Sequence, residues 1–198
     1  MKKMIGVLIA FVFVVTGCGT TGSTSEGADT SEVSAIINEH LGISPYIPET
    51  DYELGTVLLE YFPEGVRDEE PHKATISYFE SLDELETLDE EMRKEFEEND
   101  PLNRKFLYGD MYLEGRIIFI EIYPEGINMQ DGEVIDILGH DVQYVYYEKG
   151  DGRDFDFVIM TINFDDVGYS IEYLNRGQSD NIQEEAKALA EDIIENNS

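Results

Sequence analysis

DFDFVIMTINFDDVGYSIEYL, residues 154–174, predicts two strands joined by a tight turn. Its two halves, residues 154–163 and 167–174, are rich in the β-branched and aromatic side chains that favour strands. Asp165 and Asp166 lie between the halves, and aspartate is common in turns because its side chain hydrogen-bonds the nearby backbone. Strands joined by so short a connection pair antiparallel. This stretch therefore predicts an antiparallel sheet.

Strand-like segments also precede this hairpin along much of the chain. Turn-forming residues such as Gly115, Pro124 and Gly126 separate several of them. Six further strands are predicted, over residues 54–62, 73–80, 104–113, 116–123, 133–138 and 141–148. Because short turns join strands of this kind, we expect antiparallel pairing in the rest of the sheet as well.

Helical spacing of apolar residues marks three other segments. The predicted helices cover residues 31–41, 82–98 and 181–195. They occur at the start, in the middle and at the end of the domain rather than between successive strands, which is typical of the α+β class. We therefore predict a twisted antiparallel sheet with N-terminal, mid-chain and C-terminal helices packed on one face. Residues 31–198 are predicted to form this single domain.

Capping signals support the first two helices. Asp29 and Glu32 have the spacing of a capping box at the start of the first helix, and Gly42 is suited to ending it. Ser81 and Glu84 repeat that spacing. They predict that the second helix begins directly after Ser81.

The chain is strongly acidic, with 44 Asp and Glu against 13 Lys and Arg and a formal charge of −31. This charge argues against nucleic acid as a partner, because nucleic-acid binding requires Lys and Arg to replace phosphate counterions. It also argues against docking on anionic lipid through a basic patch. Two interpretations remain, a solvated acidic surface or a site for cations or basic partners.

The N-terminus has the pattern of a bacterial signal peptide. Lys2 and Lys3 form a positive start, and residues 4–15 (MIGVLIAFVFVV) form an unbroken apolar run. A membrane-spanning helix needs about 20 apolar residues, so this run is too short to remain in the membrane as a span. We expect residues 1–17 to be a lipoprotein signal peptide that is cleaved.

Val15, Thr16, Gly17 and Cys18 complete the N-terminal pattern. They resemble the lipobox of bacterial lipoproteins, in which an aliphatic residue and a small one precede Gly or Ala and then Cys. The resemblance implies cleavage between Gly17 and Cys18 and a diacylglycerol thioether on the Cys18 sulfur. Residues 18–30, rich in Gly, Ser and Thr, are then the lipidated cysteine and a flexible tether. We expect a protein anchored in the cell membrane through Cys18 and facing outside the cytoplasm.

The last third of the chain carries a second pattern. A glycine at position 139 precedes an aromatic strand, a Gly–Asp turn follows at 150–151, and the run from Gly168 leads into an acidic amphipathic helix. With these features, residues 134–194 resemble a domain of unknown function found in Gram-positive lipoproteins and anti-sigma-factor-like membrane proteins. That family often has Trp where Phe164 is the nearest aromatic residue here. The resemblance implies an extracytoplasmic α+β module with no established catalytic residues.

No motif in the sequence indicates a catalytic site or a cofactor-binding site. Nucleophile elbows and glycine-rich phosphate loops are missing. The histidines lie far apart and without metal-ligand spacing, at His40, His72 and His140. One group of aspartates has carboxylates at short spacing but not the pattern of a calcium loop: Asp151, Asp154 and Asp156. We therefore expect no enzymatic activity, no cofactor and no metal ion.

Three functions remain compatible with the sequence. We expect a non-enzymatic binding or sensory module of the cell envelope, whose partner is an envelope protein or a small ligand. One alternative is a carrier or chaperone that holds an acyl chain or a peptide in an apolar cavity, similar to the lipoprotein-carrier fold. The other is a cell-envelope hydrolase, which requires a cleft with acids of opposed pKa shifts.

Overall fold

The computed structural model describes residues 29–62, 70–83, 85–129, 132–150 and 152–197. Gly17, Cys18 and the predicted signal peptide lie outside these residues, so their roles stay predictions. The helices and strands, in chain order, are α1 (Thr30–Leu41), β1 (Glu53–Tyr61), β2 (Pro71–Phe79), α2 (Glu90–Asn99), β3 (Arg104–Gly109), β4 (Arg116–Tyr123), β5 (Glu133–Ile137), β6 (His140–Tyr147), β7 (Asp156–Asn163), β8 (Gly168–Asn175) and α3 (Ile182–Asn197). Within the described ranges, no helix is long and apolar enough to cross a membrane.

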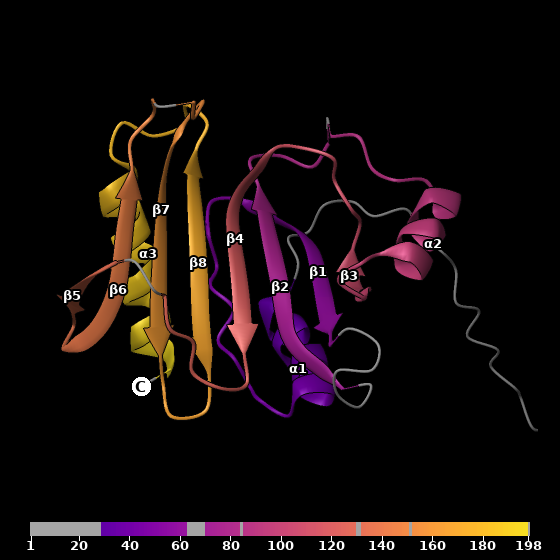
Figure 1. Cartoon of the computed structure of the whole chain (residues 1–198), viewed down its shortest axis with the longest axis horizontal. Coiled ribbons are helices and arrows are strands. Elements are labelled where there is room, and N and C mark those ends of the chain that lie inside the picture. The colour runs from indigo at the N-terminus through magenta and orange to yellow at the C-terminus, as the bar shows by residue number, and fades with distance from the viewer. Residues whose placement is uncertain (1–28, 63–69, 84, 130–131, 151, 198) are drawn as a thin grey trace, which may run out of the picture.

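The described residues form one eight-stranded sheet in the order β3-β1-β2-β4-β8-β7-β6-β5 (Figure 1). Every neighbouring pair of strands is antiparallel. Together with helices at the start, in the middle and at the end of the domain, this confirms the predicted α+β class. The hairpin of residues 154–174 forms β7 and β8. Strand β8 pairs with β4, which brings distant parts of the chain together at the centre of the sheet.

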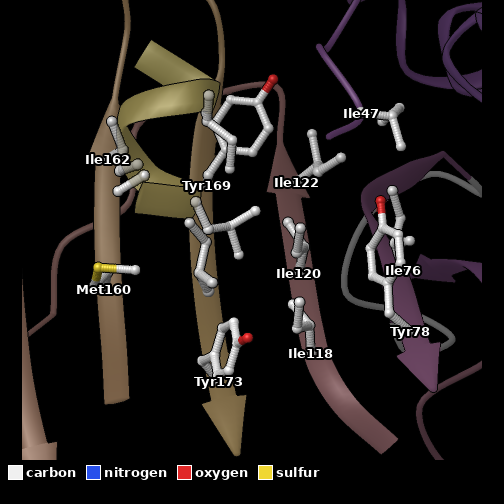
Figure 2. Close-up of a cluster of buried hydrophobic side chains, with 14 of the residues drawn as sticks. Ile47, Ile76, Tyr78, Ile118, Ile120, Ile122, Met160, Ile162, Tyr169 and Tyr173 are labelled. Atoms are coloured by element: carbon white, nitrogen blue, oxygen red, sulfur yellow. The ribbon is translucent and has the colours of Figure 1, made fainter. Parts of the chain in front are cut away.

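One face of this sheet carries the core. A single row of side chains runs across five strands, and none of its members is more than 1% exposed: Val57, Ile76, Ile120, Ile171 and Met160. Figure 2 shows this face, with isoleucines of β4 beside tyrosines of β8. Burying one such aliphatic side chain contributes about 1.5–3 kcal/mol, so this layer dominates the stability of the fold.

Helices α1 and α3 cover the core face of the sheet (Figure 1). Each follows the predicted helical spacing and turns its apolar side to the sheet. Their buried contributions to the core include Val33, Ile37, Ala186, Ala190 and Ile193. As predicted, Asp29 caps the start of α1 and Gly42, with a φ of 70°, ends it.

Helix α2 lies apart from the other two, at the edge of the sheet formed by β3 (Figure 1). Its Phe96 ring packs against Phe106 of β3, with the ring centroids 5.7 Å apart, and no residue of this helix is buried. Phe106 pairs with Leu58, whose side chain points to the face opposite Val57 because side chains alternate along a strand. All three helices were predicted to pack on one face of the sheet. Helices α1 and α3 do so, whereas α2 packs at the edge strand β3.

The second helix begins later than predicted. The sequence places it at residues 82–98, but residues 85–88 are not helical. Asp89 caps the helix in place of Ser81, and its side chain accepts a hydrogen bond from the first turn. The predicted capping partner, Glu84, lies outside the described residues. The predicted start of this helix is therefore wrong.

Long-range pairing explains this difference. Two backbone hydrogen bonds hold the segment before α2 as extended chain: Leu88 N to Met111 O (3.1 Å) and Leu113 N to Glu86 O (3.2 Å). The same pairing draws the chain after Gly109 away from β3, which is why that strand ends earlier than the predicted range of 104–113. Helix propensity is a weak preference, and the backbone pairing overrides it here.

An ion pair joins the end of α2 to the start of β3. Arg104 Nε and Nη2 donate to the two carboxylate oxygens of Asp100 at 2.8 and 2.9 Å, and the Arg104 backbone N donates at 2.9 Å. The Asp100 side chain is only 2% exposed. Burial acts to raise the pKa of Asp100, but the hydrogen bonds from Arg104 outweigh it and hold the pKa below its ordinary 3.8.

We predict that Asp100→Asn destabilises the protein by about 1.5–3 kcal/mol at neutral pH, because it weakens charge-assisted hydrogen bonds. Since the folded-state pKa is lowered, this contribution is complete above the ordinary pKa and is lost as the pH falls through the folded-state value. Urea unfolding of both proteins at neutral and acidic pH measures the effect. The difference in unfolding free energy between the wild type and Asp100→Asn should become smaller at acidic pH. A difference that stays the same would contradict the role of the ion pair.

Candidate functional site

A groove of about 600 Å³ lies on the helix-covered side of the sheet. One wall is the connection between α1 and β1, which runs alongside α3 in Figure 1. The other wall is α3, and the floor is formed by β4 and β8. We call this the acidic groove, and its lining residues are Glu49, Thr50, Asp51, Tyr52, Ile118, Tyr173, Glu185, Ala188, Leu189 and Asp192.

The floor of the acidic groove is apolar and rigid. Ile118 of β4 and Tyr173 of β8 are paired neighbours in the sheet and are 1% and 5% exposed. Leu189 of α3 closes the floor from the side and is 8% exposed. The Tyr52 ring stands edge-on to the Tyr173 ring, with the centroids 6.2 Å apart and the planes at 74°. These side chains belong to the core, so the floor is preformed.

At one end of the groove, the carboxylate of Glu185 is held by two hydroxyl groups. Tyr173 donates to Glu185 Oε2 at 3.0 Å, and Ser179 Oγ donates to Glu185 Oε1 at 2.7 Å. Burial raises the pKa of Tyr173, and hydrogen bonding to Tyr52 and the nearby Glu185 charge raise it further. The Tyr173 hydroxyl therefore stays protonated and remains a donor to Glu185.

At the other end, Asp192 is held in the same manner. Tyr46 donates to Asp192 Oδ2 at 3.0 Å, and Asn196 Nδ2 donates to Asp192 Oδ1 at 3.1 Å. Burial, together with the hydrogen bond to Asp192 and its charge, raises the pKa of Tyr46 to about 12. The Tyr169 hydroxyl, 3.2 Å from the Tyr46 carbonyl oxygen, ties this segment to β8. Both ends of the groove thus pair a carboxylate with a tyrosine.

No cation among the described residues neutralises the negative charge of the groove. Among the described residues, no lysine, arginine or histidine lines it, and none of its four carboxylates takes part in an ion pair. Residues 29–52 and 180–197, which build the helix layer, contain eleven Asp and Glu, and their basic residues are Lys187 and His40. Lys187 lies 3.4 Å from Glu184. The helix layer therefore presents uncompensated negative charge around a cavity.

On the face of the sheet opposite the acidic groove, acids lie beside lysine and arginine side chains. Lys73 lies between Glu60 and Glu121, at 3.3 and 2.6 Å, and Arg116 lies 3.3 Å from Glu172. Three acids on this face therefore share two nearby cations. Because opposite charges within a few ångströms largely cancel at longer range, these cations reduce the charge of their cluster, whereas no Lys, Arg or His lines the acidic groove among the described residues.

Residues singled out in the sequence lie elsewhere. The histidines are spread over three places: His40 is exposed in the last turn of α1, His72 stacks on Phe62, and His140 begins β6. Asp151 lies outside the described residues, and Asp156 accepts a hydrogen bond from the Lys149 backbone. In the part of the chain that the structure describes, no cluster of three or more His, Cys, Asp or Glu is arranged to hold a metal ion.

The acidic groove itself was not predicted. Its walls come from residues 49–52 and 185–192, and its floor from the β4–β8 pair, which the order of elements along the chain does not reveal. One sequence signal was present: Glu185 and Asp192 lie seven residues apart and flank Ala188 and Leu189 on one side of the last helix. Residues with that spacing share a helix face.

Neither family models nor curated proteins nor solved structures give a match to this chain. The resemblance of residues 134–194 to the lipoprotein domain family therefore stays a prediction. The acidic groove and the N-terminal sequence are the features of this chain that bear on its function.

Proposed function

We propose that this protein is a membrane-anchored extracytoplasmic lipoprotein that binds organic cations in the acidic groove and catalyses no reaction. The observation that carries the proposal is the pair of carboxylates, Glu185 and Asp192, each fixed by a tyrosine hydroxyl and neither paired with a cation in the described residues. A bound ammonium group would supply the missing positive charge. The sequence of Cys18 and its neighbours supports the anchor.

Preorganisation is the reason to expect useful affinity. Both oxygens of each carboxylate already accept hydrogen bonds, so their orientation is set before a ligand arrives. Carboxylates keep further lone pairs that can accept from an ammonium group. Hydrogen bonds between charged groups are about twice as strong as neutral ones, and little side-chain order remains to be created on binding.

The protein's own side chains fill its core, which favours a charged ligand over an acyl chain that would need an apolar cavity. The helix-covered face of the sheet is packed with the protein's own side chains, as Figure 2 shows for Ile118, Ile120 and Ile122 beside Tyr169 and Tyr173. The acidic groove lies on top of this packed layer, with Ile118 and Tyr173 as its floor, and has a rim of four carboxylates. An acyl chain longer than the apolar floor would meet the carboxylates at its ends, whereas an ammonium group would be attracted to them.

Calorimetric titration with spermidine tests the proposal. The full chain in detergent micelles should bind spermidine at low ionic strength, and the double variant Glu185→Gln/Asp192→Asn should lose affinity by at least about tenfold. Raising the salt concentration should weaken binding to the wild type, because the groove is open to solvent.

A matched control separates the groove from general acidity. Glu184→Gln/Glu191→Gln removes the same charge from α3 with the same seven-residue spacing, but neither residue lines the groove. Its spermidine affinity should stay within about twofold of the wild type, since screened charges outside the site contribute little. If both double variants lose the same affinity for spermidine, binding depends only on the net charge of the protein, and the proposed site would be rejected.

A further inference from the structure

The two acids whose carboxylates are fixed in the groove have a defined backbone separation on α3. Glu185 and Asp192 are seven residues apart on α3, which places their backbone positions about 10.5 Å apart along the helix axis. Both line the groove and therefore face the same cavity. Glu185 is hydrogen-bonded by Ser179, which precedes α3, and Asp192 by Asn196, one turn further along it, so the two carboxylates are held toward opposite ends and one ammonium group would not contact both.

The surface between them is apolar. Ala188 and Leu189 lie midway along α3 between the two acids and also line the groove. Across from them, Ile118 and the ring of Tyr173 form the floor. Read along α3, the wall is therefore acidic, then aliphatic, then acidic.

We infer that the ligand is a linear aliphatic polyamine that bridges the two ends of the groove. This inference rests on the proposed function and adds the identity of the ligand class. One terminal ammonium group binds Glu185, the other binds Asp192, and the methylene chain between them lies on Ala188 and Leu189. Each part of such a ligand meets a surface of matching chemistry, and no polar group is left without a partner.

A small polyamine suits this wall better than a basic peptide does. A peptide lying along the groove would place its backbone N–H and C=O groups over Ala188 and Leu189, whose side chains offer no hydrogen-bond partner. Burying such groups unpaired is costly. The volume of about 600 Å³ is also that of a small-molecule site.

Glu49 and Asp51 on the opposite wall have a different role. Among the described residues they take part in no ion pair, and they belong to the connection between α1 and β1. Their charges add to the field that attracts a cation toward the cavity. An ammonium group in the middle of a longer polyamine would lie on their side of the groove.

Calorimetric titration of the full chain in detergent micelles with three amines tests whether one ligand bridges Glu185 and Asp192. Octamethylenediamine carries two ammonium groups on a long chain, putrescine carries two on a short chain, and octylamine carries one on the long chain. We expect octamethylenediamine to bind roughly tenfold more tightly than either of the others, because only it gains a second charge-assisted hydrogen bond without losing the apolar contact. Either Glu185→Gln or Asp192→Asn alone should reduce its affinity to that of octylamine.

The outcomes separate this inference from the proposed function. If putrescine and octamethylenediamine bind with equal affinity, and binding is still lost in Glu185→Gln/Asp192→Asn, the groove binds cations but bridging is refuted. If a tetralysine peptide binds more tightly than octamethylenediamine and displaces it, the small-polyamine assignment is refuted in favour of a basic protein segment. If no amine binds, both the inference and the proposed function fail.

Discussion

Replacing Ile120 with alanine should lower the unfolding free energy by about 2–5 kcal/mol. Ile120 is fully buried in β4, and its paired neighbours Ile76 and Ile171 are buried as well. The strands on both sides are fixed by backbone hydrogen bonds, so they cannot move in to fill the space that the missing atoms leave. The loss therefore combines reduced apolar burial with an unfilled cavity, and urea unfolding followed by circular dichroism measures it.

A valine at the edge of the same sheet provides the control. Val134 of β5 is 60% exposed, so Val134→Ala removes apolar atoms that are already in contact with water. We expect a change within about 0.5 kcal/mol, as for most surface substitutions. Similar losses for Ile120→Ala and Val134→Ala would show that the centre of the sheet does not carry the core.

Cys18→Ala should abolish incorporation of radioactive fatty acid into the protein completely. Only the cysteine sulfur can form the diacylglycerol thioether that the lipobox resemblance implies, and the chain contains no second cysteine. The variant should also remain as an uncleaved precursor or be released from the membrane fraction, because the remaining apolar run of residues 4–15 is too short to act as a membrane span. Labelling, gel mobility and membrane fractionation measure these effects.

Thr21→Ala, in the predicted tether, is the control for this experiment. It leaves the four lipobox positions unchanged, so labelling and membrane association should equal those of the wild type. A Cys18→Ala protein that is labelled and fractionates like the wild type would overturn the predicted anchor, but it would not bear on cation binding in the acidic groove.

Hydropathy patterns predicted the sheet closely because strand periodicity is a local property. The predicted strand at residues 116–123 coincides with β4, and the hairpin of residues 154–174 forms β7 and β8. Helix α2 was misplaced because the segment before it pairs with residues 111–113, and no local signal reports such a distant partner. Sequence periodicity therefore captures the elements but not the long-range pairing that limits their ends.

The acidic groove could not be predicted for a related reason. It depends on the β4–β8 pairing, which sets Ile118 beside Tyr173, and on the path of the chain between α1 and β1. Composition revealed an acidic, tyrosine-rich chain, but it could not say that Tyr46 and Tyr173 each hold a particular carboxylate. The composition showed that acidic residues are abundant, but only the strand pairing and the chain path bring particular ones together into a site.

A nuclear magnetic resonance titration of the isotope-labelled full chain with octamethylenediamine tests the central claim most directly. We predict that the amide signals of the groove walls shift together and saturably, over residues 49–52 and 185–192, while those around Lys73 and Glu121 on the opposite face stay unchanged. Shifts centred on the opposite face, or no saturable shifts in the groove at ligand concentrations that saturate binding, would contradict the account.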